Sequence, residues 1–463
     1  MRTLSSQLTD HIGEEVIVQG WVQVRRDHGK LIFIDLRDRS GIVQVVFWGG
    51  GDQELFAQAE QLRSEFVISI TGKVKKRGEK QINPDIPSGT VELAAEKVEI
   101  LAESEVPPFP IDSGRDEVGE SIRLQYRYLD LRSERMQKNI RMRHKFIKEV
   151  RNFLDNEDFV EIETPVLAKS SPEGARDFLV PSRLSPGNFY ALPQAPQQFK
   201  QIAMIAGFER YYQIAHCFRD EDLRGDRQPE FTQLDMEMSF VDQEDILDIN
   251  ERMFKEVIGK LFPQKRMPET FPRMTYDEVM EKYNSDKPDI RENKEDNDEL
   301  AFLWVTDFPV FEKGSDGKLT FAHNPFAMPK DEDLEKLFTE DEAKLLSIRA
   351  KCYDLVLNGY ELSSGSIRIH DQKIQKRIFE MMGLSDEQVQ ERFGKFLEAF
   401  KYGAPPHGGM APGLDRVLMI LMEEPTIREV IAFPKNGEMR DLMFDGPSSA
   451  TTSQLKELGI KLG

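Results

Sequence analysis

The chain has 463 residues, and at roughly 100–200 residues per domain this length excludes a single small module and predicts two to four domains. Hydrophobic residues at 39%, charged residues at 31% and a mean hydropathy of −0.51 exclude a disordered chain and a membrane protein, and two distant cysteines, Cys217 and Cys352, exclude a disulfide framework and a cysteine-cluster zinc site. The net charge of −20 argues against a nucleic-acid partner for the average surface only, because residues 1–104 carry 13 Lys and Arg against 16 Asp and Glu, a net −3, and the remainder carries −17.

The first ten residues lack the apolar core of a signal peptide and the arginine-rich bias of a transit peptide. No apolar run approaches the roughly 18 residues that a spanning helix needs. We therefore expect a cytoplasmic protein without a membrane partner.

Residues 16–104 have the pattern of short strands. β-branched and aromatic residues are concentrated in five segments, and a helical segment interrupts them at 53–63. The strand segments are 16–24, 31–36, 42–47, 66–70 and 91–93 with 97–101. This order is typical of an OB-fold barrel, whose open face binds oligonucleotides, although a β-sandwich has a similar pattern.

Five cations lie within the eight residues 73–80. A solvated hairpin edge explains this run as well as a nucleic-acid contact does. Both interpretations stay open at this point.

A proline-rich and then polar stretch separates the barrel from the rest of the chain. Pro107-Pro108-Phe109-Pro110 ends the strand region, and polar residues with two glycines follow it. We predict a first domain over 1–104, a hinge or linker over 105–130 and a second domain over 131–463.

The second domain begins with an amphipathic helix over 136–158, because apolar residues recur there at three- and four-residue steps. A strand at 159–163 ends at Thr164-Pro165. Two later segments, 212–218 and 234–240, alternate with a period of two and predict half-buried strands of an antiparallel pair. The polar stretch 285–299 predicts an exposed connection.

The charged loop 219–232 between those two strands is the first candidate site. A solvated turn explains its charge, but its position argues for a site. Arg219 ends the first strand, and Asp235 and Glu237 share one face of the second with Ser239. A buried sheet face does not hold such groups without a ligand or partner.

The segment 408–421 is a glycine-rich passage into a helix with Arg416 in its first turn, where backbone amides favour anions. Together with Arg219 it indicates a triphosphate. A third segment, 361–370, alternates polar and apolar residues, and we predict that a bulge at Ser363-Ser364-Gly365 turns Glu361 toward the same site.

These segments resemble a known family. Thr164-Pro165, the Phe218–Glu221 loop and Gly413–Arg416 resemble, in order and spacing, the three signature motifs of class II aminoacyl-tRNA synthetases. The finer resemblance is to the bacterial-type aspartyl-tRNA synthetases of class IIb, and it is carried by Pro172–Asp177, Gln194–Lys200, Arg224–Asp235 and Ser366–His370.

The resemblance implies an α+β multidomain chain with an N-terminal OB-fold β-barrel that binds the anticodon. Its catalytic domain is expected to be an antiparallel sheet flanked by helices, and its homodimer to form through the helix and strand that end at Pro165. The implied enzyme is an aspartate–tRNA ligase that uses ATP and Mg²⁺ to activate L-aspartate and transfers it to tRNA(Asp).

The family pattern also assigns the nucleotide contacts. Arg219, Glu361 and Arg416 are the implied catalytic residues, Phe231 and Arg416 are expected to sandwich the adenine, and Glu361 with Asp354, about one turn upstream, is expected to bind Mg²⁺. The full implied ATP set is Arg219, Asp220, Glu221, Gln228, Phe231, Glu361, Gly413, Leu414, Asp415 and Arg416.

The amino-acid pocket follows in the same way. Lys200 and Arg368 are the implied cations for the side-chain carboxylate, and Asp235 is expected to orient them. A neutral amide would leave buried cations unpaired, at a cost of about 2–5 kcal/mol, which favours aspartate over asparagine. The full implied set is Glu173, Gln197, Lys200, Arg219, Asp235, His323 and Arg368.

Two features depart from the family pattern. A short acidic connection at 288–300 stands where these enzymes usually carry an inserted domain. The family's His-His-Pro-Phe loop reads His323-Asn324-Pro325-Phe326, so the contribution of the second histidine is absent.

For the tRNA, Arg26, Phe33 and Gln44 match the family's anticodon contacts, and Phe33 is suited to stack on a base. His28 resembles members that also charge tRNA(Asn), whereas Lys80 resembles stricter members. We favour charging of both tRNAs.

Three alternatives remain. An asparaginyl or lysyl relative would not be expected to combine Lys200, Arg368 and the loop up to Asp235. A small-molecule amidating relative would lack the barrel. A non-catalytic OB-fold paralogue that binds tRNA would have lost Arg219, Glu361 or Arg416, and all three are present.

Overall fold

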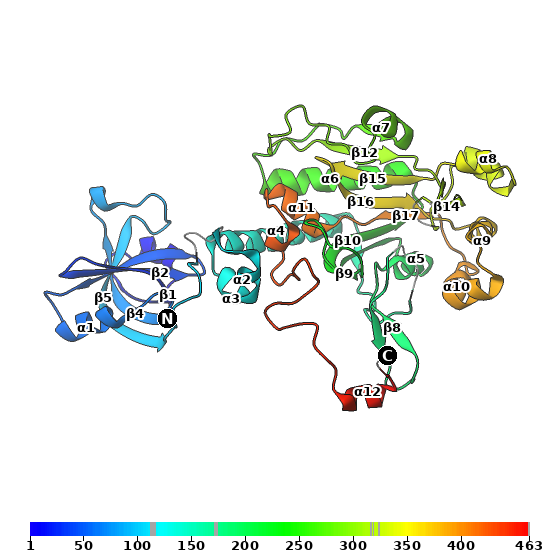
Figure 1. Ribbon diagram of the computed structural model, residues 1–463. Coiled ribbons are helices and arrows are strands. Elements are labelled where there is room, and N and C mark those ends of the chain that lie inside the picture. The colour runs from blue at the N-terminus through cyan, green and yellow to red at the C-terminus, as the bar shows by residue number, and fades with distance from the viewer. Residues whose placement is uncertain (112–116, 171–174, 315–316, 318, 323–324, 462–463) are drawn as a thin grey trace. The chain divides into compact units, whose positions relative to one another are not determined.

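The computed structural model describes residues 1–111, 117–170, 175–314, 317, 319–322 and 325–461. The chain divides into two compact units, Met1–Val118 (unit 1) and Gly119–Gly463 (unit 2). In Figure 1 the colour runs from blue at the N-terminus of unit 1 to red at the C-terminus of unit 2. Within the described residues, none of the helices combines the length and the apolar character that crossing a membrane requires.

Unit 1 is a closed five-stranded barrel in the order β1-β2-β3-β5-β4. Neighbouring strands are antiparallel except β3 and β5, which are parallel. Closure confirms the barrel over the sandwich, because every strand has a partner on both sides. The strands are β1 (Glu15–Asp27), β2 (Leu31–Asp38), β3 (Gly41–Trp48), β4 (Val67–Lys76) and β5 (Val91–Ala102).

Alternation along these strands builds the core of unit 1. In β2, for example, Ile32, Ile34 and Leu36 are buried, and the residues between them face outward. Helix α1 (Gln53–Gln61) begins at Asp52, whose carboxylate accepts hydrogen bonds from two backbone amides of the first turn. Two short 3₁₀ helices, η1 (Ser5–His11) and η2 (Glu79–Gln81), complete unit 1 as far as it is described.

Unit 2 is built on an eight-stranded sheet in the order β11-β12-β15-β16-β17-β10-β9-β6, which is antiparallel at five of its contacts and parallel at the β11–β12 and β6–β9 contacts. Two small hairpins, β7–β8 and β13–β14, lie outside the sheet. The strands are β6 (Val160–Glu161), β7 (Leu179–Pro181), β8 (Phe189–Ala191), β9 (Arg210–Phe218), β10 (Glu230–Ser239), β11 (Arg273–Thr275), β12 (Phe302–Thr306), β13 (Phe311–Lys313), β14 (Leu319–Phe321), β15 (Cys352–Leu357), β16 (Tyr360–Ile367) and β17 (His407–Met410).

The predicted amphipathic helix is α4 (Glu134–Asn156), which begins two residues earlier than predicted because the Ser133 hydroxyl caps its first turn. The remaining helices are α2 (Glu120–Gln125), α3 (Arg127–Asp130), α5 (Gln197–Ile205), α6 (Gln243–Leu261), α7 (Tyr276–Tyr283), η4 (Asp331–Phe338), α8 (Glu342–Leu346), α9 (Gln372–Met381), α10 (Asp386–Phe400), α11 (Leu414–Leu421), η5 (Ile427–Glu429) and α12 (Thr452–Leu458).

The two faces of the large sheet differ. Helices α4, α6 and α11 pack on one face and form the main core of unit 2 with Leu234, Met236 and Met238 of β10. Because side chains alternate along a strand, Asp235 and Glu237 point to the opposite face, which also carries α5. The antiparallel pairing of β9 and β10 predicted from the sequence is confirmed.

Three local predictions need correction. The bulge of β16 lies at Leu362, since Val356 pairs with Glu361 and Leu355 with Ser363. Asp354 lies on β15 beside β16 rather than one helical turn from Glu361. The acidic connection 285–299 is not exposed throughout, because Pro288 is buried and the buried ammonium of Lys265 binds Asp298 at 3.0 Å and also pairs with Glu423.

Candidate active site

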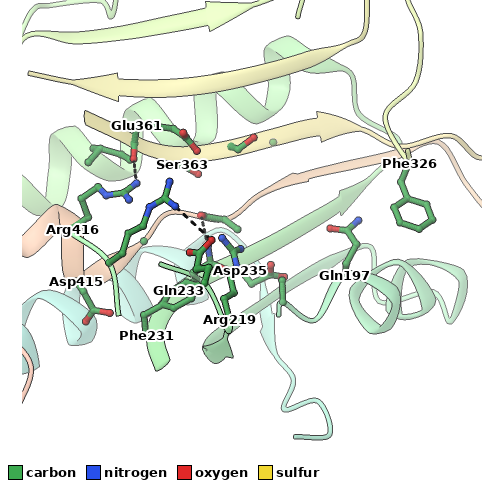
Figure 2. A pocket seen from close by; sticks show the side chains of 18 of the residues that line it. Gln197, Arg219, Phe231, Gln233, Asp235, Phe326, Glu361, Ser363, Asp415 and Arg416 are labelled. Carbon is green, nitrogen blue, oxygen red and sulfur yellow. Dashed lines mark hydrogen bonds and ion pairs between the residues drawn. The ribbon is translucent and has the colours of Figure 1, made fainter. Parts of the chain in front are cut away.

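A cavity of about 590 Å³ opens on the face of the sheet opposite the main core. This volume lies in the usual range for small-molecule sites. Strands β10 and β16, helix α5 and the start of α11 contribute its walls (Figure 2). The residues used below that line it are Gln197, Lys200, Arg219, Glu221, Gln228, Phe231, Gln233, Asp235, Phe326, Glu361, Ser363, Arg368, Gly413, Asp415 and Arg416.

One end of the cavity is formed by two arginines and a phenylalanine. The Arg219 guanidinium lies over the Phe231 ring, 5.0 Å from its centroid. Arg416 makes an ion pair with Asp226 at 3.1 Å, and its guanidinium also donates to the backbone oxygen of Glu361, beside which Figure 2 shows it. This end combines cations with an aromatic face, as a nucleotide requires.

The structure does not bring every residue of the implied ATP set to the cavity wall. The Asp220 backbone donates to Arg176 and its side chain faces that residue at 3.5 Å, and Leu414 is buried in the main core. Asp415 lines the cavity, but its carboxylate binds Arg143 of α4 and accepts from the Thr232 amide at 2.8 Å. Gln228 is buried and accepts from the Lys435 amide.

A buried charge cluster lies at the other end of the cavity, which Lys200, Asp235 and Arg368 line. The Lys200 ammonium lies 2.8 Å from Asp235 and 3.5 Å from Glu237. Arg368 donates to both oxygens of Glu237, at 2.8 and 3.1 Å, and to the Ser366 hydroxyl at 2.6 Å. The four charged side chains are 3% exposed or less, and each has a partner of opposite charge within the cluster.

Glu237 was missing from the site set expected from the sequence. The alternation of β10 had already put it on the same face as Asp235, so the signal was present. A tight backbone approach makes room for it, since a Cβ at Gly409 on the neighbouring strand β17 would lie 2.0 Å from its Oε2 atom. Glycine at 409 therefore allows a carboxylate to be buried under β17.

The two carboxylates differ in charge preference. Burial raises the pKa of Asp235, although Lys200 opposes the shift. Burial also acts on Glu237, but Arg368 and Lys200 outweigh it and hold the pKa of Glu237 below its usual range. Glu237 is thus the firmly ionised partner of the two cations.

Four buried atoms of cavity residues have no hydrogen-bond partner within the described part of the chain. They are Gln197 Nε2, Asp235 Oδ1, Ser363 Oγ and Arg416 Nε. Buried polar groups are rarely left unpaired without a reason. These donors and acceptors are placed to bind a polar ligand.

Asp354 and Glu361 lie on adjacent strands, and the pairing of Asp354 with Ser364 puts both near the bulge of β16. Burial and the neighbouring Glu361 raise the pKa of Asp354 well above its usual value. No group of three or more potential metal-binding side chains occurs among the described residues. Carboxylate pairs of this kind suit a hard cation.

Two residues of the implied aspartate set, Glu173 and His323, lie outside the described residues. Phe326, next in the same loop, lines the cavity and packs edge-on against Phe379, Phe393 and Phe396. Figure 2 places it with Gln197 at the end of the cavity away from Arg416.

The barrel brings four of the five implied tRNA residues together. Arg26 pairs across strands with Phe33, whose ring meets His28 edge-on at 5.6 Å, and Gln44 pairs with Asp35. Asp35 accepts two hydrogen bonds from Arg26, at 2.6 and 2.7 Å. Lys80 is exposed in η2, outside these strands.

Comparisons with known proteins give consistent results. A family described as tRNA synthetases class II (D, K and N) matches residues 119–437, and an OB-fold nucleic acid binding domain matches residues 16–101. The chain is 44% identical to an aspartate–tRNA(Asp/Asn) ligase of Caldanaerobacter subterraneus subsp. tengcongensis, with 97% of this chain and 96% of the relative covered. It is 42% identical to an aspartate–tRNA ligase of Staphylococcus saprophyticus, with 97% of each covered.

The first of these alignments runs over 575 positions. Since this chain has 463 residues, at least 112 of those positions have no residue in it. This difference agrees with an inserted segment that the relative has and this chain lacks.

Solved structures share the fold. An asparaginyl-tRNA synthetase from Pyrococcus horikoshii, complexed with asparaginyl-adenylate, matches with a TM-score of 0.71 and 23% identity, covering 92% of this chain and 95% of that one. An aspartyl-tRNA synthetase from Entamoeba histolytica matches with a TM-score of 0.72 and 22% identity, covering 94% and 91%.

Proposed function

We propose a function from the premise that this chain belongs to the class II tRNA synthetases of the D, K and N group. The chain is an aspartate–tRNA ligase, which activates L-aspartate with ATP and transfers it to the 3′ end of tRNA. The observation that carries this proposal is the buried cluster of Lys200, Asp235, Glu237 and Arg368, of which Lys200, Asp235 and Arg368 line one cavity with Arg219, Phe231 and Arg416.

The cluster selects aspartate by the kind of group it presents. Lys200 and Arg368 already have carboxylate partners within the protein, so a bound asparagine would not leave these cations unpaired. The energetic cost of unpaired cations that was expected from the sequence therefore does not apply. Their remaining groups toward the cavity are N–H donors, which suit both oxygens of a carboxylate but oppose the NH₂ of an amide. Asp235 Oδ1, an acceptor, suits the ammonium of the substrate.

In the first half-reaction an oxygen of the substrate α-carboxylate bonds to the α-phosphorus, and the bond from that phosphorus to the leaving pyrophosphate breaks. Arg219 stabilises the charge on the α-phosphate, while Phe231 and Arg416 hold the adenine between them. The terminal ribose hydroxyl of tRNA then attacks the carbonyl of the adenylate and AMP leaves.

Glu361 and Asp354 are the residues that would hold Mg²⁺, because their oxygens are the ligands that this ion prefers and their mutual repulsion falls when a cation is present. The ion would neutralise phosphate charge in this cavity.

The barrel binds the tRNA through the face that carries Arg26, Phe33 and Gln44, with His28 against the Phe33 ring and Lys80 in η2 as further contacts. For the assembly we propose a homodimer, supported by exposed apolar residues at β6 and after it: Val160, Val166 and Leu167. Function in translation places the protein in the cytoplasm.

The proposal is tested by Arg368→Leu. We expect aspartate-dependent exchange of pyrophosphate into ATP to be lost while ATP binding persists. The variant removes the main cation that binds the side-chain carboxylate of the substrate, and it leaves the end of the cavity with Arg219, Phe231 and Arg416 intact. Arg266→Leu is the matched control, since this exposed arginine pairs only with Asp296 at 2.6 Å among the ion pairs of the described chain. Near-normal exchange in Arg368→Leu contradicts the proposal. If exchange by the wild-type protein depends on asparagine instead of aspartate, the result supports the asparaginyl alternative.

We further propose that the enzyme charges tRNA(Asn) as well as tRNA(Asp). His28 supports this, together with the 44% identity to a relative named for both tRNAs. Transcripts of the two tRNAs, aspartylated side by side under equal conditions, test it. Absence of product with tRNA(Asn) alone contradicts dual specificity and leaves the ligase assignment unchanged.

A further inference from the structure

Trp48, the last residue of β3, is 63% exposed. The other two tryptophans differ, because Trp304 is fully buried in unit 2 and Trp21 is partly buried in the barrel. Alternation along β3 puts Gln44, Val46 and Trp48 on its outer side. Trp48 therefore lies on the same outer face as the implied anticodon contact Gln44.

Pairing with β2 places Trp48 more closely. Trp48 lies opposite Leu31, and Val46 lies opposite Phe33, so the indole is one outward row from the Phe33 ring. Two residues along a strand span about 7 Å, which successive bases of an extended single strand can match. The backbone of Gly49 donates to Lys30 at 2.8 Å and joins this end of β3 to the β1–β2 turn.

The indole is held flat by glycines. A Cβ at Gly50 would lie 2.5 Å from its Cζ2 atom, and one at Gly51 would lie 3.3 Å from its Cε3 atom. One side of the indole thus packs on the backbone of Gly50 and Gly51, and the rest of the ring is exposed to solvent. A fixed aromatic plane loses little conformational freedom when a planar group stacks on it.

The charges around Trp48 suit a nucleic acid. Lys30 and His28 are exposed in the adjacent turn, and the acidic neighbour Asp52 is engaged by the Glu54 and Leu55 amides as a helix cap. Arg25 is paired with Asp27 at 3.1 Å. The surface thus offers an aromatic plane continuous with the proposed anticodon face.

We propose that Trp48 is a stacking platform for a second unpaired base of the tRNA, next to the base that stacks on Phe33. The inference rests on the proposed function and extends it, since Trp48 belongs to none of the contacts expected from the family pattern. Base stacking is insensitive to base identity, so this contact adds affinity rather than sequence discrimination.

The first experiment measures the dissociation constant of the full chain for a tRNA(Asp) transcript. Removal of one stacking partner is expected to raise this constant by about 5- to 100-fold in Trp48→Ala, and Trp48→Phe should retain most of the affinity. The slope of log affinity against log salt should stay unchanged, because no phosphate contact is lost. Leu101→Ala, a large-to-small change at an exposed β5 residue, is the matched control and should bind like the wild type.

A second experiment tests the orientation of the ring. Gly50→Ala introduces a Cβ where the indole packs, so it should weaken binding although Trp48 is present. Tryptophan emission of the wild type should be quenched when tRNA binds, and Trp48→Phe should abolish most of that quenching. Anticodon stem-loops that each lack one loop base identify the partner, because the correct abasic loop should bind Trp48→Ala and wild type equally.

The outcomes separate the two proposals. If wild-type protein neither binds nor aspartylates the transcript, the proposed function fails. If the wild type does both and Trp48→Ala binds within twofold of it, the stacking proposal is overturned and the function stands. A Trp48→Ala defect that no abasic loop reproduces also overturns it, since the indole then contacts something other than a loop base.

Discussion

At the scale of single residues, Glu237 holds the two cations of the proposed amino-acid pocket. It accepts two hydrogen bonds from Arg368 and faces Lys200 at 3.5 Å, so one carboxylate positions both cations. The cations are thereby prearranged before a substrate arrives. Preorganised charge of this kind does not have to be reoriented when the substrate binds.

Glu237→Gln should raise the KM for aspartate at least about 10-fold in pyrophosphate exchange and lower the free energy of unfolding by about 3 kcal/mol, because a buried pair loses one charge. The KM for ATP should change much less, which a general loss of structure would not allow. Glu230→Gln on the same strand is the control, since Glu230 is partly exposed and pairs with Lys435 rather than with the buried cluster.

The pH dependence of the same variant follows from the lowered pKa of Glu237. A carboxylate with a lowered folded-state pKa stabilises the protein above its unfolded pKa near 4 and loses that effect as the pH falls through its folded pKa. The stability gap between wild type and Glu237→Gln should therefore narrow below about pH 4. Denaturant titrations followed by the buried Trp304 measure it, and a gap that widens on acidification contradicts this account.

At the scale of elements, Arg143 joins three of them. Its side chain extends from α4, binds the Asp415 carboxylate at the start of α11 and donates to the Thr232 hydroxyl of β10 at 2.9 Å. Asp415 accepts in turn from the Thr232 amide. Helix α4 is thus connected to α11, the helix that carries Arg416, and Asp415 fixes the start of α11 against α4 and β10.

Arg143→Gln should raise the KM for ATP roughly 10- to 100-fold, as expected when a hydrogen-bonded charge contributing about 1.5–3 kcal/mol is removed, with a smaller effect on the KM for aspartate. Arg141→Gln is the control, because Arg141 is an exposed residue of the same helix that donates to Gln137. Equal KM values for ATP in the two variants would show that the contact between Arg143 and Asp415 does not contribute to ATP binding.

At the scale of the whole molecule, charge is distributed unevenly. The excess of acid lies mostly beyond residue 104, and some of it is paired inside the cavity of unit 2. Strand β4 and the turn after it expose Lys73, Lys75 and Lys76. A net charge of −20 therefore does not oppose an RNA partner at the barrel.

If these lysines contact phosphates, Lys75→Gln and Lys76→Gln should each weaken tRNA binding and reduce its salt slope by about 1. Lys395→Gln, which removes an exposed charge from α10, should leave both quantities unchanged. Unchanged slopes in the β4 variants favour the other interpretation, a hairpin edge kept soluble by its lysines.

The sequence by itself determined the elements and the chemistry that they carry. Alternation predicted the barrel strands and put Asp235 and Glu237 on one face, and the glycine-rich turn predicted the helix that begins next to Arg416. These features depend on neighbours a few residues apart, which a sequence displays directly.

The tertiary structure alone decided which charges pair. Arg368 meets Glu237 across 131 residues and Arg143 meets Asp415 across 272, and Asp354 reaches Glu361 through strand pairing instead of a helical turn. It also decided that the barrel closes and that Trp48 lies flat on Gly50. Such contacts depend on how distant segments pack, because a charge or ring at a given position in the chain can face many partners until the fold selects one.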